Sequence, residues 1–182
     1  MAISYEPILT TTNRGSGVAD YILWVPVSHF DVNGIKCPAV PDDNTTNAQL
    51  VTIEETHVFL VDHGFLRINC SPAKNNLEAN MIGEVGSLKF MKSLKVFIPG
   101  SDAALHSQIT QMMNEPGIYL VKDATCPADM WYQLGCDCVF AQFKDGKFTT
   151  GTNKDGVKGY EITIEAPSEA VTLYAGDITY AV

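Results

Sequence analysis

The sequence predicts one mainly antiparallel β domain, a sandwich or barrel, with a single flanking α-helix. Short runs of branched and aromatic residues recur along the chain, and Gly, Pro, Asn and Asp separate them at short intervals. This spacing is typical of β-sandwiches and β-barrels. With 182 residues, 46% of them hydrophobic, the chain is long enough to bury its own core. We expect residues 1–20 to form an N-terminal arm and residues 21–182 to form the domain.

In the first half of the chain, turn signals place the expected strands. Pro26 limits the first strand to an edge or a bend, because proline lacks a backbone N–H. Asn33-Gly34 predicts a two-residue hairpin, since both residues tolerate positive φ. His63-Gly64 marks a turn between two runs that resemble a long antiparallel pair. In chain order we expect a strand at 21–27, the hairpin at 30–37, an extended loop at 38–49, and paired strands at 50–61 and 65–70.

One segment in the second half has helical spacing. Ser101 is a suitable N-cap, and Leu105 and Ile109 begin an apolar series at helical intervals, which predicts the flanking helix at about 101–114. Residues 71–80 fit either a short helix or a loop. The other expected elements are strands at 87–98, 118–122 and 130–134, a hairpin joining 138–143 to 148–150 through Asp145-Gly146, a strand at 160–165, and a closing strand or tail at 171–174 and 178–182.

The clearest strand pattern lies near the C-terminus. Tyr160, Ile162 and Ile164 alternate with polar residues that include Glu161 and Glu165. One face of this strand is therefore predicted to be dry, and the other acidic and wet. The acidic face is either ordinary solvated surface over a core or the lining of a wet space inside an assembly, and both interpretations remain open at this point.

The charge balance disfavours several classes of partner. Acidic residues number 21 against 12 basic ones, which gives a formal net charge of −9, and Arg14 and Arg67 are the only arginines. Tight DNA or RNA binding needs clustered Lys and Arg and is not expected, whereas an acidic surface lets a polyanion pass without sticking. Residues 1–12 do not resemble a signal peptide, and no apolar run approaches a membrane span. We expect a protein made and kept in a cytoplasm, at least at first.

Two candidate chemical sites each have a simpler explanation. His57, Asp62 and His63 lie close in sequence, but the turn gives them no assured common orientation. We therefore favour one half-buried strand histidine and one turn histidine over a metal site. Ser101 follows a strand-to-helix turn that lacks the Gly-x-Ser-x-Gly pattern of a nucleophile elbow, so a helix cap is favoured. We expect no enzyme activity, no cofactor and no metal.

The five cysteines are odd in number and lack the paired spacing of a zinc site. Cys136 and Cys138 lie two apart, so on a strand their sulfurs face the same side, and Cys126 lies a little earlier in the chain. A fourth ligand is not evident. We therefore favour structural thiols over a soft-metal or redox site.

The order of several motifs resembles the tail tube proteins of long-tailed bacteriophages and related prophages. The resemblance covers most of the chain beyond residue 50 and is one of layout. It is carried by Thr56-His57-Val58-Phe59 before Gly64-Phe65, Gly83-Glu84-Val85-Gly86 before a long strand, the single capped helix, Gln133-Leu134-Gly135, Phe148-Thr149-Thr150-Gly151-Thr152 and Gly159-Tyr160-Glu161-Ile162-Thr163-Ile164.

This resemblance implies a self-assembling structural protein of the virion. The family implies a β-sandwich that assembles into stacked, usually hexameric rings, whose inner sheets join into one barrel that conducts DNA without specific binding. Glu161 and Glu165 would face this lumen. Other tail proteins (tape measure, terminator, and baseplate or hub) would be partners, and assembly would occur in the cytoplasm of the bacterial host, without a membrane. The expected subunit contacts are the N-terminal arm with Arg14, the 38–49 loop with Asp42 and Asp43, and the C-terminal strand with Tyr180.

Two other interpretations remain. A tail terminator or completion protein of similar fold would form rings that cap a tube without stacking. A carbohydrate- or host-binding β-sandwich module would use Trp24, Trp131 and Tyr132 as stacking residues, although large aromatic residues more often belong to a core.

Overall fold

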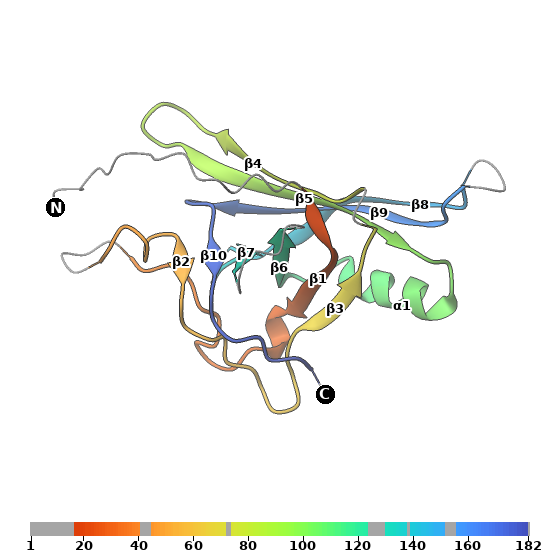
Figure 1. Ribbon diagram of the computed structural model, residues 1–182, viewed down its shortest axis with the longest axis horizontal. Helices are drawn as coiled ribbons and strands as arrows, with labels where there is room; N and C mark the ends of the chain where they lie inside the picture. The colour runs from red at the N-terminus through yellow and green to blue at the C-terminus, as the bar shows by residue number, and fades with distance from the viewer. Residues whose placement is uncertain are drawn as a thin grey trace.

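The computed structural model describes residues 17–40, 45–71, 74–123, 130–137, 139–151 and 156–181. In these residues ten strands form two sheets, and one α-helix flanks them (Figure 1). The predicted mainly β class with a flanking helix is confirmed. Across the described ranges neither sheet closes on itself, so the arrangement is sandwich-like and the barrel alternative is wrong.

The larger sheet has six strands in the order β2-β10-β7-β6-β1-β3. All neighbours run antiparallel except β2 and β10, which are parallel. The first strand begins at Val18, inside the segment expected to be an arm, and ends at Pro26. The strands of this sheet are β1 (Val18–Pro26), β2 (Thr52–Ile53), β3 (Leu66–Asn69), β6 (Gly117–Asp123), β7 (Trp131–Leu134) and β10 (Leu173–Tyr174).

The smaller sheet has four longer strands in the order β4-β5-β9-β8, and every neighbour is antiparallel. Its two central strands, β5 and β9, pair without interruption from Phe90↔Ser168 to Pro99↔Gly159. Both central strands are rich in branched and aromatic residues, which pack well on a pleated surface. The strands are β4 (Asn76–Ile82), β5 (Lys89–Pro99), β8 (Gln142–Thr149) and β9 (Gly159–Ser168).

Two hydrophobic cores lie on opposite faces of the six-stranded sheet. Ile22 and Trp24 of β1 belong to the core between the two sheets, whereas Leu23 and Val25 belong to an outer core. Both faces of the second half of β1 are therefore buried, which explains why the run from Ile22 to Val25 is continuously apolar instead of alternating. Segments that follow β1 supply further residues to the outer core: Phe30 and Phe65 come from connecting segments and Ile53 from β2.

The predicted helix is present as α1 (Ala103–Met112). Its N-cap is Asp102, whose carboxylate accepts a hydrogen bond of 2.8 Å from the backbone N–H of Leu105, so the assignment of Ser101 as the cap is wrong by one residue. The carboxylate satisfies an N–H that has no partner within the helix and suits the positive helix end. Ile109 and Met112 pack into the core between the sheets.

Two strand predictions in the first half are wrong. Asn33 has a φ of 58°, as a turn requires, but no hairpin forms around it. Gly34 packs so closely on the chain that an added Cβ would lie 2.1 Å from the carbonyl oxygen of Val58. The run 50–61 contributes only the short strand β2, and β3 pairs with β1 instead of with this run. In this segment the chain buries aromatic residues in the outer core instead of forming a long pair of strands.

The four-stranded sheet contains two further differences from the sequence prediction. Asn76–Ile82, within and beyond the ambiguous segment, forms strand β4. The predicted hairpin turn at Asp145-Gly146 does not form, because β8 continues through it with a register shift between Phe143 and Asp145. A local bulge of this kind accommodates turn-forming residues inside a strand whose pairing with β9 is otherwise maintained.

Candidate assembly surfaces

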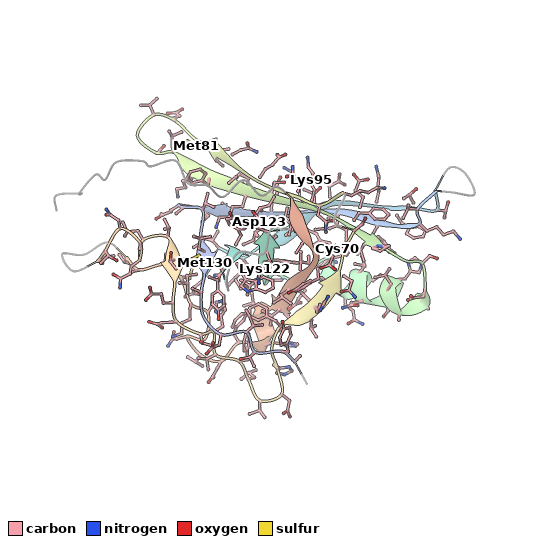
Figure 2. All side chains as sticks on the ribbon, viewed as in Figure 1. Cys70, Met81, Lys95, Lys122, Asp123 and Met130 are labelled. Carbon is pink, nitrogen blue, oxygen red and sulfur yellow. A yellow bond between two sulfur atoms is a disulfide. The ribbon has the colours of Figure 1, made fainter. Side chains whose placement is uncertain are left out.

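The outer face of the four-stranded sheet is the face turned away from the six-stranded sheet. Glu161 and Glu165 of β9 lie on this face, while Ile162 and Ile164 between them are buried in the core. Lys95 of β5 projects from the same side (Figure 2). The predicted alternation is therefore present, and it places both acidic residues on one polar surface.

Both glutamates on this face are ion-paired. Glu161 lies 2.9 Å from the Nζ of Lys147, and Glu165 lies 2.7 Å from the Nζ of Lys144. The hydrogen bond between Lys147 and Glu161 is the main cause that lowers the pKa of Glu161 and raises the pKa of Lys147. Exposed pairs of this kind contribute little to stability. They make the face polar and charge-balanced, whereas the sequence alone suggests an acidic one.

The four-stranded sheet has an open strand at each side. Strand β4 forms one edge and β8 the other, and in the described part of the chain no further strand pairs with either. Most residues of both strands are exposed. Each edge therefore presents backbone N–H and C=O groups that can pair with another chain.

The turn that joins β4 to β5 contains the motif Gly83-Glu84-Val85-Gly86, which the sequence places before a long strand without indicating that a hairpin forms there. It projects beyond the rest of the molecule (Figure 1), and Met81, Val85 and Leu88 are exposed there. The alternation of Leu77, Ala79 and Met81 with polar residues is the signal that identifies β4 as a strand and would have placed this turn.

Of the residues predicted to make contacts between subunits, one is described. Arg14, Asp42 and Asp43 lie outside the described residues. Tyr180 is half-exposed and forms a parallel bridge with Phe65, which attaches the C-terminal segment next to β3. The structure therefore places Tyr180 at the surface of the outer core and away from the four-stranded sheet.

His57 belongs to a buried polar cluster. The backbone N–H of Lys36 donates to Nδ1 of His57 at 3.0 Å, so Nε2 carries the proton and donates to Oε1 of Gln133, also at 3.0 Å. The ring stacks on Tyr174 with 4.7 Å between centroids. Burial lowers the pKa of His57 to about 4, so the imidazole is uncharged at neutral pH.

His63 lies elsewhere, stacked on His29 with 3.9 Å between ring centroids. Burial, and then the charge of His63, lower the pKa of His29. In the ranges that the structure describes, no group of three or more His, Cys, Asp or Glu side chains is placed to hold a metal ion. The fold therefore gives His57 and His63 separate structural contacts.

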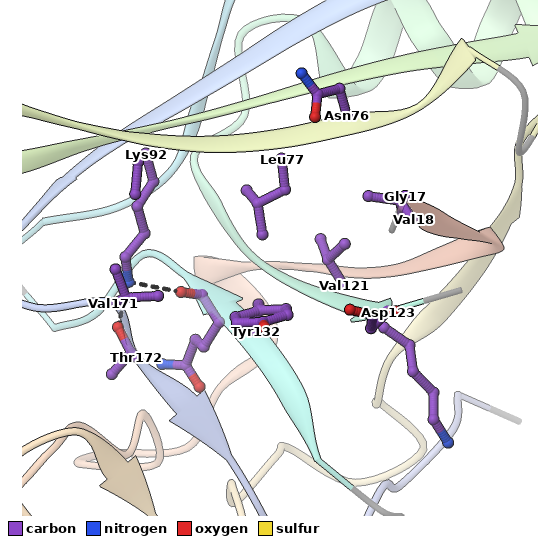
Figure 3. A pocket seen from close by; sticks show the side chains of 13 residues that line it. Gly17, Val18, Asn76, Leu77, Lys92, Val121, Asp123, Tyr132, Val171 and Thr172 are labelled. Carbon is purple, nitrogen blue, oxygen red and sulfur yellow. Dashed lines mark hydrogen bonds between the residues drawn. The ribbon is translucent and has the colours of Figure 1, made fainter. Parts of the chain in front are cut away.

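Lys92 connects the two sheets through the same cluster. Its Nζ donates to the carbonyl of Gln133 at 2.9 Å and to Oγ1 of Thr172 (Figure 3). Burial lowers the pKa of Lys92 to about 8. A cavity of about 230 Å³ lies beside it, lined by Leu77 and Tyr132 among others. Two neutral oxygens thus accept hydrogen bonds from the buried amine, and Lys92 links the two sheets through these polar contacts.

One pair of cysteines forms a disulfide. Cys37 and Cys136 are 99 residues apart in sequence, and their Cα atoms lie 5.7 Å apart. The preference for structural thiols is therefore wrong for this pair, because the fold brings together residues whose spacing carries no signal. Cys70 is a buried free thiol, and burial raises its pKa to about 12. Cys126 and Cys138 lie outside the described residues.

The aromatic residues proposed for carbohydrate stacking are part of the interior. Trp24 is buried in the core between the sheets and Trp131 in the outer core. Tyr132 is half-buried and packs against the core between the sheets. These three side chains therefore do not form an exposed platform on which a sugar ring can stack.

Comparison of the chain with models of protein families, with curated proteins and with solved structures finds no match. Within the described ranges, no helix combines the length and the apolar character that crossing a bilayer requires. The geometry of the described residues therefore carries the functional proposal.

Proposed function

We propose that this chain is a structural subunit that assembles into rings, and that stacked rings form the tail tube of a phage or prophage virion. DNA would pass through the lumen without specific binding. The observation that carries the proposal is the four-stranded antiparallel sheet, which has an open edge at each side, β4 and β8.

The strand order supports a ring in particular. Because the sheet has an even number of antiparallel strands, β4 and β8 run in opposite directions. A neighbouring copy rotated about an axis along the strands brings its β4 against β8 in antiparallel orientation. This contact joins two different edges, so it is heterologous and closes into a ring when the rotation closes. Pairing of this kind also protects edges that would otherwise promote aggregation.

The outer face of the sheet suits the wall of a DNA channel. Its lysines Lys144 and Lys147 are each paired with a glutamate, so they offer phosphates no unpaired cluster of positive charge. In the tube, Glu161 and Glu165 would line the lumen. The tape measure, terminator and baseplate or hub proteins would be the other partners of such a tube.

Electron microscopy of concentrated protein tests this proposal directly. We expect rings or tubes, whereas compact monomers at every salt concentration would contradict it. Rings that cap but never stack would indicate a terminator instead.

Reversal of one edge charge tests the pairing of β4 with β8. Strand β4 carries Glu78, whereas β8 carries Lys144 and Lys147. Glu78→Lys should weaken assembly roughly two- to fivefold per interface, because it places like charges on the two edges. Glu54→Lys makes the same charge change on an exposed residue outside the four-stranded sheet and should assemble as the wild type does. Equal assembly of the two variants would argue against edge pairing.

A further inference from the structure

The cavity of about 230 Å³ beside Lys92 lies between the two sheets (Figure 3). We call it the Lys92 cavity. Well-packed protein interiors contain few voids larger than a water molecule, so a space of this size has room for a small ligand. Asn76 and Val171, which are both exposed, are among the residues that line it. The cavity therefore reaches the surface of the molecule, where a ligand can enter it from solvent.

Both sheets contribute to the walls of the Lys92 cavity. The four-stranded sheet supplies Leu77 and Lys92, and the six-stranded sheet supplies Val18, Val121 and Tyr132. Apart from Lys92, these side chains are aliphatic or aromatic. A concave space with apolar walls and a few polar groups is typical of a site for a small molecule.

Lys92 is a buried cation that lacks a counter-charge. It is only 3% exposed, and its Nζ donates to the carbonyl of Gln133 and to Oγ1 of Thr172. A protonated amine has three N–H donors, so these contacts leave one N–H without a partner in the described part of the chain. The ion pairs found there involve other lysines, and burial is what lowers the pKa of Lys92. A buried charge without an opposite charge is costly, and an anion beside it would remove that cost.

We propose that the Lys92 cavity binds a small aliphatic monocarboxylate. The carboxylate accepts the remaining N–H of Lys92 and supplies the missing negative charge, while the aliphatic chain packs against Leu77, Val121 and Tyr132. A hydrogen bond between an ammonium and a carboxylate is roughly twice as strong as one between neutral groups. This binding does not depend on self-assembly, so its test is separate from that of the proposed function.

The other charged residues of the lining favour a ligand with a single carboxylate. Lys122 lines the cavity, but its Nζ lies 5.3 Å from the ring centroid of Trp131, which belongs to the outer core on the opposite face of the sheet. Asp123 lies across the cavity from Lys92 (Figure 3). A second carboxylate on the ligand would therefore meet a like charge at that end and no second amine.

Butyrate is a suitable probe because it has one carboxylate and a short aliphatic chain. Titration of the full chain at about pH 7, followed by NMR spectroscopy, should give saturable binding with a Kd of about 1 mM or tighter. Butyramide has the same number of non-hydrogen atoms but no charge, so it should bind at least about tenfold more weakly. Equal affinities for the two probes, or no saturation with butyrate up to about 50 mM, would overturn the proposal.

Two variants of β5 test whether the anion binds at Lys92. Lys92→Met keeps an unbranched apolar side chain and removes the amine, so it should weaken butyrate binding at least about tenfold. Lys95→Met makes the same change at an exposed position on the same strand and should bind butyrate as the wild type does. An unchanged affinity in Lys92→Met would show that butyrate binds elsewhere on the chain.

The pH dependence of the wild type decides the question if Lys92→Met does not fold. The pKa of Lys92 is about 8, so most of its amines are protonated at about pH 7 and only about 3% at about pH 9.5. The affinity for butyrate, which stays ionised throughout, should therefore fall about 30-fold between these pH values. The affinity for butyramide should change little. The same butyrate affinity at both pH values would contradict pairing with Lys92.

Discussion

Lowering the pH from about 7 to about 5 probes the buried cluster around His57. In the folded protein the N–H of Lys36 donates to Nδ1, and burial lowers the pKa of the imidazole to about 4 from an ordinary value of 6.5. Protonation of Nδ1 would set an N–H against the N–H of Lys36 and place a charge in the outer core. Acid is therefore expected to destabilise the fold.

The two pKa values of His57 give the magnitude. The folded pKa lies below the unfolded one, so the unfolded chain takes up the proton first as the pH falls. The stabilisation from the neutral imidazole is complete above pH 6.5 and is lost progressively towards pH 4. One pKa unit corresponds to about 1.4 kcal/mol, so the full loss is about 3 kcal/mol and the loss reached by about pH 5 is about 2 kcal/mol.

Urea denaturation at the two pH values, followed by tryptophan fluorescence, measures this loss. His57→Asn keeps a side-chain oxygen that can accept the N–H of Lys36, but it has no titration in this range. The free energy of unfolding of this variant should fall by about 2 kcal/mol less than that of the wild type. His106→Asn removes a half-buried imidazole on α1 and should keep the wild-type difference. Identical pH dependence of wild type and His57→Asn would refute a neutral, buried His57.

Two further predictions concern the disulfide and the inter-sheet lysine. Cys136→Ser should lower the free energy of unfolding, measured by urea denaturation, by about 4 kcal/mol, because the bridge to Cys37 closes a long loop. Reductant should lower the free energy of unfolding of the wild type by the same amount and leave that of the variant unchanged. Raising the pH from about 7 to about 9.5 should stabilise the wild type through Lys92 by about 2 kcal/mol. Its folded pKa of about 8 lies below the ordinary 10.5, so the fold favours the neutral amine at high pH. Lys92→Met should lack this gain, and an equal gain in both proteins would contradict the assignment.

Period-two patterns made much of the four-stranded sheet predictable. Ile162 and Ile164 alternate with Glu161 and Glu165, and the structure buries both isoleucines, exposes Glu161 and leaves Glu165 half-buried. The helix was equally accessible to prediction because apolar residues at helical spacing follow a capping side chain. In both cases one face of a single element meets the core, so local sequence carries the signal.

Segments buried on two faces, or held by loops, were not predictable in the same way. The run 50–61 looks like a strand because branched apolar residues recur at both of its ends, but Ile53 and Phe59 pack in the outer core and only the short strand β2 forms a ladder. Asp145-Gly146 looks like a hairpin turn, but long-range pairing with β9 keeps it inside β8. Local propensity lost to tertiary pairing at this site.

The same distinction between local and long-range signals applies to the candidate surfaces. The placement of Glu161 follows from alternation, but its partner Lys147 depends on the register between β8 and β9, which sequence does not supply. The disulfide between Cys37 and Cys136 depends on a contact across 99 residues. Surfaces that arise from one strand were therefore foreseeable, while features assembled from distant segments, such as this disulfide, were not.

The buried polar cluster fixes how the two sheets lie on each other. Apolar contacts between sheets tolerate a slip, but Lys92 on β5 must reach the carbonyl of Gln133 on β7 and the hydroxyl of Thr172. A slip of one residue would leave a buried amine without acceptors, at a cost of several kcal/mol. The disulfide between Cys37 and Cys136 attaches the segment around Cys37 just after the end of the same strand β7. The two open edges, β4 and β8, therefore keep a fixed position relative to the six-stranded sheet, and every subunit must present this same arrangement to its neighbours if rings are to close.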